Sequence, residues 1–223
     1  QKTAYEIYQC DWSSDVCSSD LPNLRQAALA ALALVLGLAL YLGLERGVTP
    51  RVDLSSSLDA RIPFLPWTWA VYIAYFPFVV LAAAYADEAR FRRFAWQAGA
   101  AFALAMLCFM LWPEILTRPP VAEIDNAFLR QRIARLWWLD APANGFPSLH
   151  VALTCLACGL PAARVLRRAA VPVALLIVAS TLTLKQHTLA DVAGGLALAG
   201  LMVAAAVWRR GARRAVRSAG AAA

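Results

Sequence analysis

Residues 24–44 read LRQAALAALALVLGLALYLGL and carry a single charged side chain, Arg25. A run of about 20 apolar residues is long enough to cross the hydrocarbon core of a bilayer as a helix. Five more apolar runs follow along the chain. We therefore predict an all-α, polytopic membrane protein that folds as one bundle of six transmembrane helices. The predicted spans are residues 24–44, 67–86, 94–112, 149–165, 169–184 and 189–208.

The 223-residue chain is 61% hydrophobic and has a formal net charge of +7. Its arginines gather after the second, fourth and sixth predicted spans, at Arg90, Arg92, Arg93, Arg164, Arg167, Arg168, Arg209, Arg210, Arg213, Arg214 and Arg217. A positive net charge is also typical of nucleic-acid-binding proteins. In a chain with six spans, however, these arginine clusters would all lie on the same side of the membrane. The positive-inside rule explains that asymmetry. The prediction is a bacterial inner-membrane protein with both termini in the cytoplasm and no nucleic-acid partner.

The two ends of the chain differ from the predicted membrane domain, residues 22–208. Residues 1–21 are polar, have no helical period, and repeat Ser-Ser-Asp at 13–15 and 18–20. They lack the basic start and apolar core of a signal peptide. Because they resemble translated sequencing-adapter DNA, we expect them to be non-native. Residues 209–223 are expected to form a basic cytoplasmic tail.

The longest polar loop, residues 113–147, separates the third and fourth predicted spans. Apolar residues recur in it at helical spacing, at Ile124, Phe128, Ile133, Leu136 and Trp137. This pattern, with arginines interspersed, predicts an amphipathic interfacial helix that lies on the bilayer surface. The arginines either face solvent or steer anionic lipid headgroups toward a site.

Several other positions within the spans are interpreted as structural. Tyr72 and Tyr75 of the second span are assigned to interface and packing roles. Cys155 and Cys158 form a C-x-x-C on an apolar helix without further ligands, which favours packing over metal binding. The first span has no deep polar residue and is interpreted as scaffold.

The chain has two histidines, and each lies in a polar motif between apolar runs. Such groups are costly at membrane depth and are therefore functional candidates. In residues 144–150, NGFPSLH, Gly145 is expected to allow a sharp turn, and Pro147 to lie in the first turn of a helix. The free N–H groups of that helix end would form an anion site, with Ser148 as hydroxyl donor and His150 as proton donor. A helix cap with an incidental histidine is the alternative.

The second histidine, His187, precedes Asp191 by four residues in the segment TLKQHTLAD, residues 183–191. On a helix this spacing puts both side chains on one face. A carboxylate there would fix the ring tautomer and raise the basicity of the other ring nitrogen. Lys185 and Arg118 are cations in the same polar zone and suit the oxygens of a phosphate. The alternative is a structural His–Asp pair that ties two spans together.

These segments resemble the type 2 phosphatidic acid phosphatase superfamily, whose signature is K-x6-R-P, then P-S-G-H, then S-R-x5-H-x3-D. The matching positions are Arg118-Pro119, Pro147-Ser148-Leu149-His150, and Ser180, His187 and Asp191. The resemblance covers residues 62–208 and includes a six-helix architecture.

Three positions depart from that signature. Leu111 stands at the lysine of the first motif, Leu149 at the glycine of the second, and Thr181 at the arginine of the third. Lys185 is expected to supply one of the two missing cations. The combined pattern is similar to the branch of the inositol phosphorylceramide synthases and their bacterial relatives, which contains phosphotransferases as well as phosphatases. The departures therefore bear on acceptor and substrate more than on the reaction core.

The resemblance implies a role for each residue. His187 would attack phosphorus and form a phosphohistidine, Asp191 would orient His187, and His150 would protonate the leaving alcohol and then activate water or an acceptor hydroxyl. The phosphoryl oxygens would be bound by Arg118, Lys185, Ser148 and the backbone N–H of Leu149. No metal or other cofactor is implied.

The leading prediction is an integral membrane phosphatase of lipid-linked phosphate esters, active at the extracytoplasmic face, with a lipid phosphate substrate and the bilayer as partners. A phosphotransferase that passes a headgroup phosphate to a lipid or polyol acceptor would use the same residues. A non-catalytic lipid-binding or transport protein is the third alternative. The two missing cations favour it, whereas no internal repeat of the kind found in transporters is present.

Overall fold

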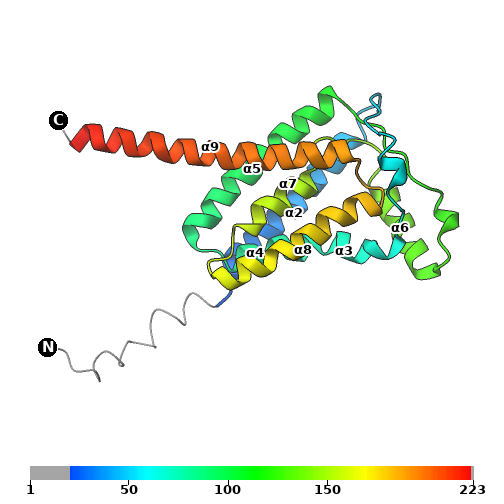
Figure 1. Cartoon of the computed structure of the whole chain (residues 1–223), viewed down its shortest axis with the longest axis horizontal. Helices are drawn as coiled ribbons and strands as arrows, with labels where there is room; N and C mark the ends of the chain where they lie inside the picture. The colour runs from blue at the N-terminus through cyan, green and yellow to red at the C-terminus, as the bar shows by residue number, and fades with distance from the viewer. Residues whose placement is uncertain (1–20, 222–223) are drawn as a thin grey trace, which may run out of the picture.

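A computed structural model describes residues 21–221, and the regular secondary structure in this range is all helical (Figure 1). Its α-helices are α2 (Leu24–Glu45), α3 (Trp69–Ile73), α4 (Tyr75–Ala84), α5 (Glu88–Leu111), α6 (Ala127–Leu139), α7 (Leu149–Cys158), α8 (Arg164–Thr183) and α9 (Leu189–Ala221). Short 3-10 helices are η1 (Asp59–Arg61), η2 (Pro66–Thr68) and η3 (Val121–Glu123). The prediction of an all-α chain is confirmed. The predicted non-native segment lies outside the described residues, apart from Leu21.

Within the described residues, five helical segments are long and apolar enough to cross a bilayer, namely Leu24–Glu45, Pro66–Ala84, Glu88–Leu111, Arg164–Thr183 and Leu189–Ala212. They support the prediction of a membrane protein. The predicted fourth span, residues 149–165, differs, because α7 ends at Cys158 and α8 begins at Arg164. Ten helical residues rise about 15 Å, roughly half the hydrocarbon thickness. The six-span topology therefore stays a prediction.

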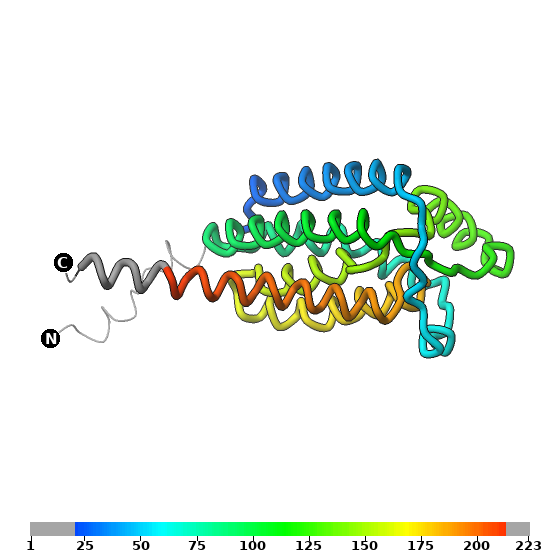
Figure 2. The backbone as a smooth tube through the Cα atoms, turned by 90° about the horizontal axis from the view of Figure 1, so that it is seen from above, coloured from blue at the N-terminus to red at the C-terminus, as the bar shows by residue number. Residues whose placement is uncertain are grey.

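The short helix α7 lies at the centre of the bundle. It contacts α4, α5, α8 and α9, and Val151, Ala152 and Ala157 on it are fully buried. Helix α2 runs along one side, while α8 and α9 lie on the opposite side (Figure 2). A helix surrounded on several sides in this way is apolar almost all round, which is why its sequence reads like a membrane span.

The predicted second span is broken into η2, α3 and α4. Pro77 has no N–H to donate to the Ile73 carbonyl, so the regular helix is interrupted at Ala74. The break leaves Tyr72 and Tyr75 on either side of it, and both side chains are buried rather than interfacial. The interface assignment of these tyrosines is therefore wrong, and their packing role is taken up below.

The predicted amphipathic helix in residues 113–147 exists as α6. Asn126 caps it by accepting a hydrogen bond from Leu129 N. Ile133 and Ile124 are buried in a small hydrophobic cluster with Tyr72 and Leu184. Part of the apolar face thus packs on protein, and its placement on a bilayer surface stays a prediction.

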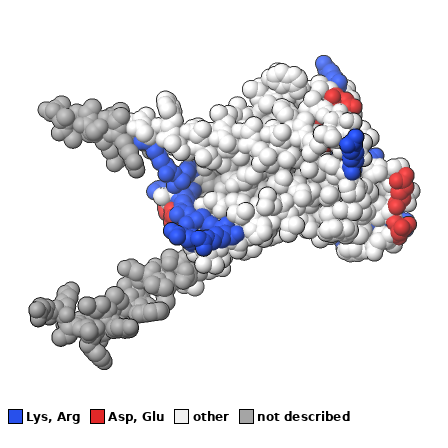
Figure 3. Space-filling model, viewed as in Figure 1, with Lys and Arg blue, Asp and Glu red and all other residues white. Residues whose placement is uncertain are grey.

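Arginine side chains gather at the end of the bundle where α8 begins and α9 leaves the bundle (Figure 3). Arg90 and Arg167 both donate to the Pro161 carbonyl there, and Arg209 lies over the Trp96 ring. Helix α9 continues through the predicted basic tail as far as Ala221. Among the arginines whose side chains the structure describes, one from each predicted cluster, namely Arg90, Arg167 and Arg209, therefore lies at this end of the fold.

Two glycines of α9 give a matched test of how closely α7 and α9 pack. A Cβ on Gly195 would lie 2.6 Å from the Ser148 carbonyl oxygen and 2.9 Å from Val151 Cβ, whereas a Cβ on Gly200 would meet nothing within 4 Å. We expect Gly195→Ala to destabilise the fold by about 1–3 kcal/mol through overpacking against backbone. Gly200→Ala should be neutral or stabilising by up to about 1 kcal/mol. Thermal unfolding in detergent checks both variants, and equal melting temperatures would contradict the close packing.

Candidate active site

His187 and Asp191 are in contact, as their spacing predicted. The His187 Nδ1 atom lies 3.2 Å from Asp191 Oδ2, and the Asp191 side chain is fully buried. His187 itself precedes α9, which begins at Leu189, so the two do not share a continuous helix. The contact forms because Thr188 caps α9. Its N–H donates to Asp191 Oδ2 at 2.8 Å, and its Oγ1 accepts from Asp191 N at 3.3 Å. This reciprocal capping holds the carboxylate beside the imidazole.

His150 lies in the first turn of α7, with its ring centroid 6.1 Å from that of His187. Tyr72 stacks on His150 at 4.4 Å, and Tyr75 packs against it at 4.2 Å. These two tyrosines orient the imidazole, a role that the sequence reading missed. The Nε2 atom of His150 has no hydrogen-bond partner in the described part of the chain. It is therefore an unsatisfied buried nitrogen in a side chain that lines the cavity described below.

The segment before α7 caps the helix. The Ser148 hydroxyl accepts a hydrogen bond from Val151 N, and Ser148 N donates to the Asp191 carbonyl oxygen at 3.1 Å. Pro147 thus precedes the cap, not the first helical turn as predicted, since Ser148 still has an extended backbone. Leu149 opens the helix and lines the cavity described below. The fully buried Ser148 is not among the cavity-lining residues.

Gly145 is needed for space, not for the sharp turn that was expected of it. The left-handed residue in this loop is Asn144, with φ 57°. A Cβ on Gly145 would lie 2.5 Å from Asp191 Oδ2 and 2.6 Å from Glu114 Oε2. Only glycine lets the loop pass so close to both carboxyl groups.

Arg118 is close to the site but is engaged by protein groups. Its guanidinium donates to the carbonyl oxygens of Asp140 and Ala141, lies 3.8 Å from the Asp140 carboxylate, and packs over the Trp137 ring at 5.5 Å. Burial lowers the pKa of Arg118. Its Nε atom is buried without a partner, so the guanidinium retains one free donor in this arrangement.

Lys185 is also engaged by protein groups. Its ammonium donates to the backbone carbonyls of Asp59 and Ile62 at 2.9 and 2.6 Å, which ties the loop of η1 to the turn before α9. Neither Lys185 nor Arg118 is among the residues that line the cavity. The structure thus brings His150, His187 and Asp191 together but leaves both predicted phosphate-binding cations bound to carbonyl groups.

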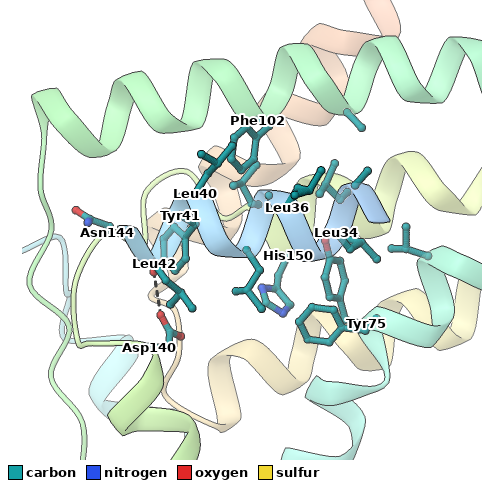
Figure 4. A pocket seen from close by; sticks show the side chains of 18 of the residues that line it. Leu34, Leu36, Leu40, Tyr41, Leu42, Tyr75, Phe102, Asp140, Asn144 and His150 are labelled. Carbon is teal, nitrogen blue, oxygen red and sulfur yellow. Dashed lines mark hydrogen bonds between the residues drawn. The ribbon is translucent and has the colours of Figure 1, made fainter. Parts of the chain in front are cut away.

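A cavity of about 690 Å³ begins at the two histidines and extends along α2 between α4 and α5. Figure 4 shows His150 and Tyr75 at its wall, with leucines of α2 and Phe102 around it. The far end is lined by apolar side chains such as Leu29, Phe91 and Phe94. Helix α2 is therefore part of the site, and its interpretation as scaffold alone is corrected.

The polar end of the cavity contains residues that the sequence reading did not single out. Tyr41 of α2 donates to Asp140 Oδ1 at 2.9 Å (Figure 4), and Gln186 Nε2 donates to Asp140 Oδ2 at 3.3 Å. Burial raises the pKa of Asp140. Asn144 and Gln186 are both buried and have side-chain atoms without partners. These groups present hydrogen-bonding atoms beside the histidines. Among residues 21–221 no set of three His, Cys, Asp or Glu side chains is placed to hold a metal ion.

The described chain is a helical bundle whose long apolar helices are typical of a membrane protein. In it, a His–Asp pair lies beside a second histidine at the polar end of an apolar cavity. The sequence model of a family described as the PAP2 superfamily matches residues 60–205, more than half of the chain. The chain therefore belongs to the PAP2 superfamily, which is consistent with a phosphatase or a phosphotransferase. No curated protein and no solved structure matches the chain significantly. The narrower resemblance to inositol phosphorylceramide synthases stays a prediction.

Proposed function

We propose that this protein is a membrane phosphatase that hydrolyses lipid-linked phosphate esters through a phosphohistidine at His187. The observation that carries the proposal is the position of the two histidines at the polar end of an apolar cavity. A lipid phosphate has the matching shape, with a charged head and a long apolar chain. The cavity walls would bury that chain, and each buried methylene contributes about 0.8 kcal/mol.

The geometry supports a two-step reaction. Because Asp191 engages Nδ1 of His187, the lone pair of Nε2 is free to attack phosphorus. The bond from phosphorus to the leaving oxygen breaks, and that oxygen takes a proton from His150. Water then attacks phosphorus and gives a proton to His150 while the P–N bond breaks, releasing phosphate. The negative charge of a bound phosphate favours the protonated form of His150 that the first step needs.

Phosphate binding in this proposal involves Ser148, the Leu149 backbone N–H and Arg118, with Lys185 as a further cation. The N–H groups in the first turn of α7 have no intrahelical partners, and an anion is favoured there. Arg118 and Lys185 would have to exchange backbone carbonyls for phosphoryl oxygens when substrate binds. The Nε atom of Arg118 is buried and has no partner, so it would bind a phosphoryl oxygen only after the guanidinium turns toward the cavity.

A second candidate function, phosphotransfer to a hydroxyl acceptor, is favoured by the polar residues beside the histidines. Asp140, Asn144 and Gln186 line the cavity and supply acceptors for the hydroxyl groups of an alcohol or polyol. His150 would then activate the acceptor hydroxyl in place of water. The chemistry at His187 is the same in both reactions.

We expect the histidine end to lie at the extracytoplasmic face of a bacterial inner membrane. The arginine-rich end, where Arg90 and Arg167 meet Pro161, is opposite to it and would face the cytoplasm. Both termini would then be cytoplasmic.

The testing experiment follows products from the purified full chain in detergent. The substrates are a diacylglycerol phosphate, a polyprenyl phosphate and diphosphate, and a lipid with an inositol phosphate headgroup, each with and without added inositol or lipid alcohol. Release of inorganic phosphate supports hydrolysis. A new phosphorylated product that requires the acceptor supports transfer. Binding of lipid phosphate without turnover of any substrate would overturn both and favour a lipid-binding protein.

A pair of α2 variants tests whether the cavity takes the lipid chain. Gly37 lines the cavity, and a Cβ there would make ordinary contact with Phe102 at 3.5 Å. Gly37→Leu should lower kcat/KM for a long-chain lipid phosphate by about tenfold or more, because each excluded methylene costs about 0.8 kcal/mol. Turnover of a short, water-soluble phosphate ester should change little. Gly43→Leu on the same helix, outside the cavity lining and with open space around it, is the control. Equal effects on both substrates would contradict the assignment.

A further inference from the structure

Glu114 is a fully buried carboxyl group that the reaction outlined above does not use. It follows α5 in the chain, and backbone contacts of its loop hold it in place. Isolated β-bridges pair Glu114 with Val52 and Ile115 with Ala143. In addition, Asn144 N donates a hydrogen bond to the Glu114 carbonyl oxygen at 3.3 Å. The carboxyl group is thereby held beneath the loop that precedes α7.

The side chain of Glu114 reaches Asp191. Its Oε2 atom and Asp191 Oδ2 both lie against Gly145, which puts the two oxygens within about 5 Å of each other. On the other side, Thr188 Oγ1 lies 3.5 Å from Glu114 Oε1. Thr188 and Gly145 therefore bring the two carboxyl groups together.

Glu114 has no compensating cation in the described residues. The ion pairs found in residues 21–212 include none to Glu114, and its Oε2 atom and Asp191 Oδ1 have no hydrogen-bond donor. Two ionised carboxylates so close together in a buried site would repel each other strongly. A proton held on one of them removes the repulsion and provides the missing donor. Because Asp191 already accepts from His187 and Thr188, the proton belongs on Glu114.

We propose that Glu114 is a positioning residue of this site, whose protonated carboxyl donates a hydrogen bond to Asp191 and so holds that carboxylate against His187. The inference rests on the proposed function for its effect on turnover. The hydrogen bond leaves Asp191 as the single negative charge behind the nucleophile. It also stops the carboxylate from rotating away from Nδ1, which keeps the tautomer with a free Nε2.

The protonation state gives the proposal a pH signature. Burial, followed by the hydrogen bond and charge of Asp191, raises the pKa of Glu114 to about 9. The titratable groups that face the Glu114 carboxyl are Asp191 and Asp53, the latter from the neighbouring loop. His187 affects Glu114 indirectly, because it contacts Asp191. Below about pH 9 Glu114 is neutral and donates. Above it, Glu114 becomes a second negative charge that pushes Asp191 away, so activity should fall.

The first test is independent of turnover. The infrared spectrum of the full chain in detergent at neutral pH should contain a carboxylic-acid C=O band that is missing in Glu114→Gln. The band should also disappear as the pH is raised through about 9. Asp53→Asn, at an exposed carboxylate, is the matched control and should keep the band. A spectrum in which Glu114→Gln removes no such band would overturn the proposal, whatever the activity of the protein.

The second test is the pH profile of kcat/KM for the lipid phosphate that the wild-type chain turns over. Glu114→Gln keeps a neutral donor, so it should retain activity within about tenfold at pH 7 and lose the decline above pH 9. Glu114→Ala should lose activity at all pH values, with a melting temperature measured alongside. An unchanged alkaline decline in Glu114→Gln, or a folded Glu114→Gln without activity, would overturn the proposal. Failure of the wild-type chain to turn over any substrate would instead count against the proposed function and leave the infrared test standing.

Discussion

Substituting His187 by alanine is expected to lower the rate of phosphate release by about 10⁴-fold or more, the scale on which removal of a covalent nucleophile acts. The physical reason is that no other group in the described cavity lining has a nucleophilic nitrogen activated by a carboxylate. His187 has this arrangement through its 3.2 Å contact with Asp191. The measurement is kcat on the best lipid phosphate, together with trapping of an acid-labile phosphoenzyme from substrate labelled on phosphorus.

The His187→Ala variant keeps the capping of α9, because Thr188 and Asp191 bond to each other independently of the imidazole. Its melting temperature in detergent should therefore stay close to that of the wild-type chain. Under those conditions, loss of both the labelled intermediate and phosphate release supports the nucleophile assignment. Release at the wild-type rate from a folded His187→Ala protein would exclude the phosphohistidine mechanism.

Asp191→Asn is expected to reduce kcat by about 10³–10⁴-fold, the size of effect known for the equivalent change in a Ser-His-Asp triad. His187 Nδ1 and Thr188 N both contact Oδ2 of Asp191. An amide oxygen at that position would keep both hydrogen bonds but would carry no negative charge. His187 would then be a weaker nucleophile, and the positive charge that develops on its ring as it attacks phosphorus would lose its stabilising partner.

The control for this substitution is Asp125→Asn, at an exposed carboxylate in the loop before α6. It removes the same charge without touching the histidines, so its kcat should stay within about twofold of the wild-type value, as for a surface change. The phosphoenzyme should fall with kcat in Asp191→Asn alone. A fully active Asp191→Asn protein would mean that the His–Asp contact only ties the turn to α9.

Much of the candidate site follows from local spacing in the sequence. His187 and Asp191 are four positions apart, and the contact forms even though His187 precedes the helix. The same stretch contains a capping signature, Thr188-Leu-Ala-Asp191 before an apolar run, which is a recognisable helix start. It agrees with the predicted start of the sixth span at residue 189, where α9 begins, and it also links Thr188 to the Asp191 carboxylate.

Other parts of the site depend on contacts between distant segments. Tyr41 and Asp140, which share a hydrogen bond, come from the first predicted span and from the end of α6. Glu114 follows an apolar run and looks like an ordinary interfacial carboxylate in the sequence. Its burial against Asp191 arises only when the loops before α7 and after α5 pair through Ile115 and Ala143. No local pattern encodes that pairing.

The partners of the two predicted cations likewise depend on contacts that no local sequence pattern encodes. Arg118 and Lys185 have suitable charge and position in the sequence, but buried donors are satisfied by the nearest acceptors. For Lys185 these are the carbonyls of the η1 loop, and for Arg118 those that follow α6. Which acceptor lies nearest is decided by how the loops are packed.

The amino-acid sequence by itself determined the helical membrane character of this protein, the pairing of His187 with Asp191 and the presence of His150 in a second polar motif. These features depend on the apolar length of each run and on the helix cap at Thr188, both of which are local. The tertiary structure alone decided that α7 is a short central helix, that Tyr72 and Tyr75 pack on His150, and that Glu114 lies against Asp191. Those contacts depend on which buried surfaces and polar groups meet when segments far apart in the chain pack together, so spacing along the chain does not reveal them.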